Sequence, residues 1–113
     1  MQPMAPADSK TVEVVDGVYL TQLVAGERMS IQHFHIESGA TVPAHSHEHE
    51  QAGYVVNGTF TFIIDGEEHV IHPGESYMIP GDVEHAAENR AEMPVDGIDI
   101  FSPPRANAPW AEE

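Results

Sequence analysis

Three histidines and a glutamine follow one another at every second position near the middle of the chain: His45, His47, His49 and Gln51. In an extended segment alternate side chains point to the same face, so the pattern predicts a row of imidazoles and one amide on a single strand face. Such donors suit Zn, Ni, Fe, Mn or Cu, and the absence of cysteine excludes a thiolate site. The same pattern also fits a solvated strand edge that binds nothing.

The other histidines have different expected positions. His85 opens a later predicted strand after a tight turn, where it can supply a further nitrogen to the row from a neighbouring strand. His33 and His35 share one side of an alternating strand and are expected to line a barrel wall or a subunit contact. His69 and His72 flank a turn and are expected to face solvent.

The elements that must position these side chains are short strands separated by turns. The chain has 113 residues, the size of one domain, and its 9 Gly and 9 Pro suit a turn-rich β fold. Asn57-Gly58 and Asp65-Gly66 each predict a type I′ turn, so two hairpins are expected to share the strand between them. Short strands without a helical period predict an all-β sandwich or barrel. The expected strands are Thr11–Val15, Val18–Val24, Met29–Glu37, Gly53–Val56, Thr59–Ile64, His69–Ile71, Ser76–Ile79, His85–Ala87 and Gly97–Phe101.

Composition divides the chain into three parts. Residues 1–10 are expected to form a flexible arm, residues 11–102 the β-barrel, and residues 103–113 a tail that packs on the barrel. Pro103 and Pro104 cannot continue a central strand because they lack ladder donors. Beyond them, Pro109-Trp110 offers an aromatic anchor.

The spacing around the histidines resembles the two motifs of the cupin superfamily, in its small single-domain form. The first motif is matched by Gly39, His45, His47, Gln51 and Gly58, and the second by Gly74, Pro80, His85 and Asn89. Two positions depart from the usual pattern: Gln51 stands where Glu is usual, and Asp82 stands where Gly is usual.

The resemblance implies a cupin fold, a small double-stranded β-helix or jelly-roll barrel, with a divalent metal ion inside. The implied ligands are His45, His47, Gln51 and His85, and the metal is Ni, Zn, Mn or Fe. A neutral Gln51 leaves the site one charge more positive than Glu, which weakens metal retention but makes the ion a stronger Lewis acid. His49, on the same predicted face, is an alternative to Gln51 as a ligand, or a proton carrier.

The end of the predicted barrel adds a narrower resemblance, carried by Asp99, Phe101, Pro103 and Arg105 in an Asp-x-Phe-x-Pro-x-Arg pattern. It is similar to small pectin-degradation cupins that convert cyclic 4,5-unsaturated monouronates into linear keto acids. That resemblance implies Asp99 as the acid or base and Arg105 as the group that binds the carboxylate of a sugar acid. A salt bridge from Arg105 to an acidic surface is an alternative, and Phe101 is expected to be a wall residue.

Two other function classes stay open from the sequence. One is a cupin dioxygenase loaded with iron or copper, with open positions for oxygen and substrate. The other is a non-catalytic cupin that binds a sugar or metabolite and needs no chemistry from Asp99. The same barrel hosts unrelated activities, so the substrate and the metal are not fixed by the motifs.

Charge limits the partners further. Nineteen acidic against four basic residues give a net charge of −15, which disfavours nucleic acid and anionic membranes. Such an excess resembles proteins of organisms that accumulate salt. No apolar run approaches the roughly 20 residues of a membrane helix, and the N-terminus lacks a basic region followed by an apolar one, so a cytoplasmic protein is expected. A small core also suggests a homodimer, with residues 1–10 and the strands within 11–24 as the contact.

Overall fold

The computed structural model describes residues 3–106, and its ten strands confirm the predicted all-β class. A short 3-10 helix, η1 (Pro6–Asp8), lies within the segment expected to be a loose arm. The strands are β1 (Thr11–Val15), β2 (Val18–Ala25), β3 (Ser30–Ile36), β4 (Thr41–His45), β5 (Glu50–Asn57), β6 (Phe60–Ile64), β7 (Glu67–Ile71), β8 (Ser76–Ile79), β9 (His85–Glu88) and β10 (Val95–Ser102). Within residues 3–106, no helix is long and apolar enough to cross a membrane.

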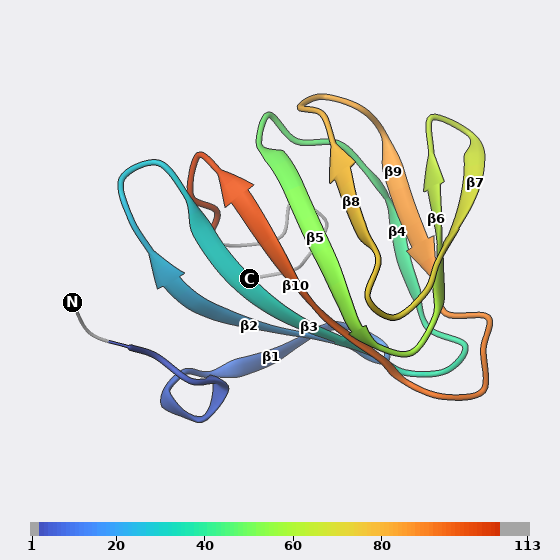
Figure 1. Ribbon diagram of the computed structural model, residues 1–113, viewed down its shortest axis with the longest axis horizontal. Coiled ribbons are helices and arrows are strands. Elements are labelled where there is room, and N and C mark those ends of the chain that lie inside the picture. Colours follow the sequence, from blue (N-terminus) through green and yellow to red (C-terminus); the bar gives the residue numbers. More distant parts are fainter. Residues whose placement is uncertain (1–2, 107–113) are drawn as a thin grey trace.

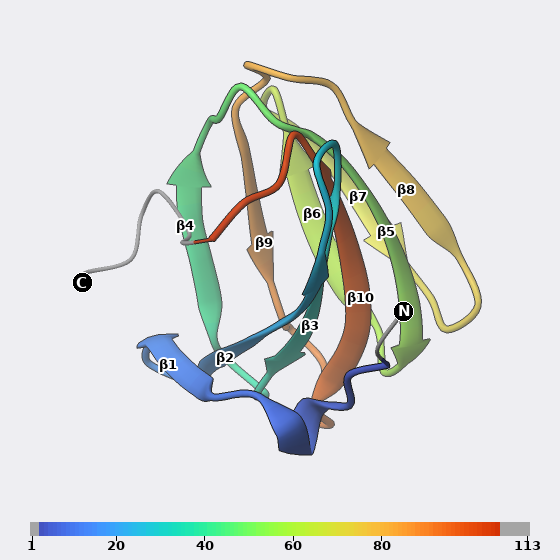
Figure 2. The same ribbon diagram turned by 90° about the vertical axis from the view of Figure 1, so that its left-hand side faces the viewer.

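The strands form two antiparallel sheets that curve around a shared interior (Figure 1; Figure 2). The larger sheet has the order β1-β2-β3-β10-β5-β8, and the smaller one has the order β4-β9-β6-β7. Burial alternates along the central strands β3 and β10, which places every second side chain in the interior. The apolar core joins both sheets and contains Val18, Phe34, Ile36, Val55, Phe60, Phe62, Ile79, Ala87 and Val95.

One of the two predicted hairpins is confirmed and the other is wrong. Asp65 and Gly66 both have positive φ, 51° and 82°, and they join the paired strands β6 and β7 as a type I′ turn requires. At Asn57-Gly58 only the glycine has positive φ, and the chain passes from β5 in the larger sheet to β6 in the smaller one. Gly58 lies so close to the backbone that an added Cβ would be 2.4 Å from the carbonyl oxygen of Pro94.

The histidine row is also not a single strand. Strand β4, which the sequence pattern missed, ends at His45, and β5 begins at Glu50. The residues between them carry the chain from the smaller sheet to the larger one. Therefore His45 and Gln51 reach the interior from opposite sheets, and sheet crossing rather than strand alternation brings the row together.

The chain after β10 lies against the start of β3. The backbone N–H of Arg105 donates to Oγ of Ser30 at 2.9 Å, and the hydroxyl of Ser102 donates to the carbonyl of Arg28 at 2.6 Å. The Ser102–Pro103 peptide bond is cis. Pro109-Trp110, the expected anchor, lies outside the described residues.

Candidate metal centre and adjoining cavity

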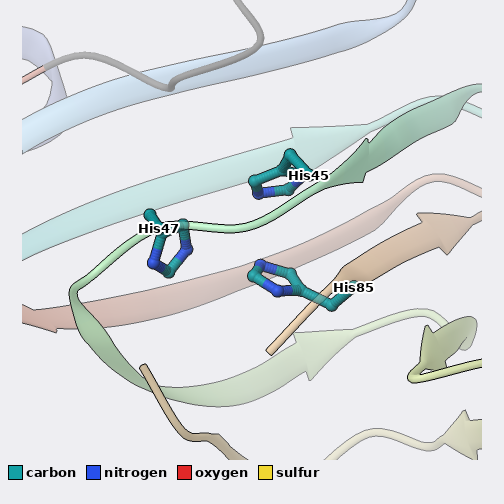
Figure 3. A group of neighbouring side chains, drawn as sticks. All are labelled: His45, His47 and His85. Atoms are coloured by element: carbon teal, nitrogen blue, oxygen red, sulfur yellow. The ribbon is translucent and has the colours of Figure 1, made fainter. Parts of the chain in front are cut away.

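Three histidines meet in the interior where the two sheets approach each other. His45 at the end of β4 pairs in register with His85 at the start of β9, and His47 comes from the segment that crosses between the sheets. One ligand nitrogen from each ring lies within 4.8 Å of the others. Figure 3 shows the rings turned toward one another. His47 and His85 are buried and His45 is half-buried.

Backbone carbonyls fix the tautomer of all three rings. In each ring Nδ1 lies within hydrogen-bond distance of a carbonyl oxygen two residues away, and these carbonyls belong to Pro43, His49 and Val83 at 2.8, 2.9 and 2.9 Å, respectively. A carbonyl only accepts, so Nδ1 must carry the proton, and the lone pair of the neutral ring is then on Nε2. Metal-ligating histidines are commonly oriented through their other nitrogen in this way.

Burial keeps the three rings neutral. It lowers the pKa of His45 to about 4, and it is also the largest cause that lowers the pKa of His47 and His85. The nearby Arg105 guanidinium lowers all three pKa values further. Neutral imidazole is the form that binds a metal, so no proton has to be displaced from these rings at neutral pH.

Two details show that this donor set fits a divalent cation. Nε2 of His85 is buried and has no hydrogen-bond partner among residues 3–106. Nε2 of His47 lies 3.2 Å from Oε1 of Gln51, so two atoms that carry lone pairs face each other. A cation between them would satisfy both, and three imidazole nitrogens with one amide oxygen suit borderline divalent metals.

His49, the alternative ligand, lies differently. Its ring centroid is 5.5 Å from that of His47 and 6.2 Å from that of Phe101, and its buried Nδ1 has no partner among the described residues. It does not belong to the group of ligand atoms formed by the other three histidines. The geometry therefore favours Gln51 over His49 as the fourth donor.

Asp99 lies beside this group on the inner face of β10. Its side chain is buried, and Oδ1 accepts a hydrogen bond from the Tyr77 hydroxyl at 2.6 Å. Burial raises the pKa of Asp99 to about 6, although hydrogen bonds from Tyr77 and Gln51 and the charge of Arg105 act in the opposite direction. A carboxyl with such a pKa can both accept and donate a proton near neutral pH.

Arg105 is buried above the same strand face. Its Cζ lies 3.8 Å from the centroid of the Phe101 ring, and Nη2 donates to Oε1 of Gln32 at 3.4 Å. Burial lowers the pKa of Arg105 to about 10, against the charge of Asp99. Nε has no hydrogen-bond partner, and no ion pair joins the guanidinium to a carboxylate within residues 3–106. The expected wall residue Phe101 therefore also carries a stacked guanidinium, a contact that the sequence pattern did not predict.

One cavity between the sheets joins these groups. Its polar lining includes His45, Gln51, His85, Asp99 and Arg105. Two further polar lining residues, Tyr77 and Gln32, were not predicted from the sequence pattern. Both belong to predicted strands, but only the pairing of those strands with their neighbours shows that they reach Asp99 and Arg105.

The remaining histidines lie elsewhere. His33 and His35 point out of the larger sheet toward Asp96, with nitrogen–oxygen distances of 3.8 and 2.7 Å, so they do not line the barrel interior. His69 and His72 are exposed beside carboxylates, as expected of residues that flank a turn.

The sequence model of the cupin domain family matches residues 32–101, more than half of the chain. The chain is a cupin. Asp82, where cupins usually have Gly, adopts a left-handed φ of 66°, and its N–H donates to the carbonyl of His47 at 2.7 Å. That backbone conformation explains why glycine is the usual residue at this position.

This cupin is similar to a pectin degradation protein and to two cupins of solved structure. It is 31% identical over 96 residues to the pectin degradation protein KdgF of Dickeya dadantii. The aligned region covers 84% of this chain and 86% of that protein. The structure of KdgF from Halomonas sp. matches with a TM-score of 0.84 and 27% identity, over 93% of this chain and 96% of that one. An RmlC-like cupin from Shewanella frigidimarina matches with a TM-score of 0.79 and 26% identity, over 92% and 96% of the two chains.

Proposed function

We propose that this cupin converts cyclic 4,5-unsaturated monouronates, products of pectin or alginate breakdown, into linear keto acids. The observation that carries the proposal is a single cavity lined by histidines that can hold a metal, by the acid Asp99 and by the guanidinium of Arg105. The similarity to two KdgF proteins supports pectin breakdown as the setting.

Arg105 would bind the substrate carboxylate. Its buried Nε has no acceptor among residues 3–106, and an unpaired buried donor of this kind is costly unless a ligand satisfies it. A carboxylate can accept two parallel hydrogen bonds from a guanidinium, and stacking on Phe101 holds the guanidinium plane in place.

Asp99 would move the protons that ring opening requires. The anomeric hydroxyl gives up a proton and the bond from the anomeric carbon to the ring oxygen breaks, which yields an aldehyde and an enolate. The enolate becomes a ketone when its carbon gains a proton. The product is an isomer of the substrate, so the reaction needs no oxidant. The buried carboxyl of Asp99 can accept the first proton and donate the second.

His45, His47, His85 and Gln51 would hold the metal. When bound, a divalent ion such as Ni, Zn, Mn or Fe stabilises negative charge on a substrate oxygen. The protein keeps the rings neutral and their Nδ1 atoms anchored to carbonyls, so the site is arranged before the ion arrives.

The test is an assay of the metal-loaded protein with unsaturated monouronates. Ultraviolet absorbance of the substrate should fall as a linear keto acid appears, and Asp99→Asn should lose turnover with its metal content intact, because the amide keeps the shape but not the acid function. Equal turnover by Asp99→Asn would eliminate this role. If wild type turns over no unsaturated uronate, the function is wrong; oxygen uptake with bound iron would then indicate a dioxygenase, and binding without turnover a binding protein.

We also propose that the chain forms a homodimer through the arm and the first two strands. β1 is an edge strand, and Val12 and Val24 expose 44% and 40% of their surface. An exposed edge of this kind readily accepts another chain. Light scattering in concentrated salt should give the mass of two chains, and a monomer would reject the proposal.

A further inference from the structure

A polar row crosses the inner face of the larger sheet at one register level. Tyr77 on β8, Gly53 on β5, Asp99 on β10 and Gln32 on β3 lie opposite one another on successive strands. Gly53 has no side chain, and a Cβ added there would lie 2.0 Å from Cζ of Tyr77. The tyrosine ring therefore passes over β5 at the only kind of residue that leaves it space, and its hydroxyl reaches Asp99 at 2.6 Å.

Gln51 lies two residues before Gly53, on the same inner face of β5, and it is buried. Its Oε1 faces Nε2 of His47 at 3.2 Å. Gln51 is also the diagonal neighbour of Asp99 across the β5–β10 pair, both side chains line the same cavity, and a hydrogen bond from Gln51 acts to lower the pKa of Asp99. A carboxylate only accepts, so the amide group of Gln51 must be the donor in that second contact. One side chain thus has its oxygen toward the histidines and its nitrogen toward the acid.

We propose that Gln51 is a positioning residue that couples the metal centre to Asp99, while Tyr77, reaching over Gly53, holds the same carboxyl from the other side. The catalytic meaning of this arrangement rests on the proposed function, but the hydrogen bonds do not. The arrangement also explains the departure from the first cupin motif. A glutamate at position 51 would place two buried carboxylates side by side with no donor between them.

A double-mutant cycle on the full chain tests the coupling. Wild type, Gln51→Glu, Asp99→Asn and the double variant are unfolded with denaturant after the metal has been removed with a chelator. Gln51→Glu should destabilise the metal-free protein, and adding Asp99→Asn should restore the unfolding equilibrium constant by about ten-fold, because the new amide donates to the new carboxylate. Additive effects of the two changes would overturn the proposal.

If Gln51→Glu does not fold, proton nuclear magnetic resonance tests the same hydrogen bonds in variants that keep Gln51. In the metal-free protein the side-chain amide protons of Gln51 should shift in Asp99→Asn, because their acceptor is no longer a carboxylate. The Tyr77 hydroxyl should give a low-field proton signal that is absent in Tyr77→Phe and present in Tyr54→Phe, an exposed tyrosine on the other face of β5. The proposal would be overturned if the Gln51 amide protons kept their chemical shift in Asp99→Asn, or if wild type gave no Tyr77 hydroxyl signal.

Steady-state kinetics distinguish a positioning role of Tyr77 from a purely structural one. Tyr77→Phe should lower kcat about ten-fold with KM within two-fold, as expected when a group that orients the reacting acid is lost. Tyr54→Phe should match wild type, and an unchanged kcat in Tyr77→Phe would contradict the positioning role. If the cycle shows coupling but no unsaturated uronate is turned over, the hydrogen-bonded unit stands and only the proposed function fails.

Discussion

At the residue scale, the site depends on hydrogen bonds that fix the orientation of its polar side chains. Each histidine ring is anchored through Nδ1 to a backbone carbonyl only two residues away along the chain, so the local backbone sets the orientation of the ring. The spacing of His45, His47 and His85 was readable in the sequence because the ligands of one ion need such clustering. The carbonyls that anchor the rings could not be predicted from the sequence, because any residue type can supply a backbone carbonyl.

The histidine cluster gives the first prediction. His47→Ala should abolish the binding of one metal ion per chain, since it removes a buried nitrogen that the other two rings and Gln51 cannot replace. The measurement is elemental analysis after gel filtration. His69→Ala is the matched control, because its ring lies beside Glu67 and 45% of its side chain is exposed. Unchanged metal content in His47→Ala would place the metal elsewhere.

Gln51→Glu should act in opposite directions on the two forms of the protein. It should raise metal affinity by about ten-fold, because it adds a negative charge next to a divalent ion. The metal-free protein should at the same time lose stability, since the new carboxylate lies beside Asp99. Titration with a competing chelator measures the affinity. A lower affinity would argue that Gln51 is not a ligand.

Arg105→Ala should mainly weaken substrate binding. The guanidinium would contact a carboxylate that is present in both the ground and the transition state, so KM should rise about ten- to hundred-fold, more than kcat falls. Arg90→Ala is the control, because this arginine is exposed and paired with Glu68 on the surface. A fall in kcat without a change in KM would give Arg105 a role in the chemistry instead.

At the element scale, local turn chemistry predicted some features and missed others. The Asp65-Gly66 turn was predictable because both residues tolerate positive φ and the hairpin is local. Asn57-Gly58 carries the same local signal, but its strands pair with β8 and β10, and with β7 and β9, instead of with each other. Sheet crossing is decided by contacts far apart in sequence, so neither this turn nor the passage from β4 to β5 was predictable from alternation.

Strain in one of these turns gives a prediction of its own. Asp82 has a φ of 66°, where an aspartate costs more than a glycine. Asp82→Gly should therefore stabilise the protein by about 0.5 kcal/mol, after the greater entropy of glycine in the unfolded chain is subtracted. Gly58→Ala should destabilise it, because its Cβ would meet the Pro94 carbonyl. Denaturant unfolding measures both, and a loss of stability in Asp82→Gly would show that the aspartate makes a compensating contact.

At the scale of the whole molecule, the fold places almost all of the described acidic side chains at or near the surface and very few charged groups in the interior. Asp99 is the only buried acid among residues 3–106, so the other described carboxylates lie at or near the surface. A net charge of −15 opposes both compaction and the approach of an anion. The sequence revealed this excess at once, but not that a single carboxyl and a single guanidinium, Asp99 and Arg105, had been placed in the interior.

Salt should therefore raise activity. The Debye length falls from about 10 Å at 0.1 M salt to about 3 Å at 1 M, so surface carboxylates stop repelling an anionic uronate, while the short-range attraction of Arg105 and the metal remains. We expect KM to fall between these concentrations with an unchanged circular dichroism spectrum, and sucrose, which does not screen charge, to leave KM unchanged. Stability should rise over the same range, because self-repulsion weakens. A KM that is constant or rises with salt would contradict the electrostatic argument, and full stability after dialysis into low salt would reject adaptation to a salt-rich cell.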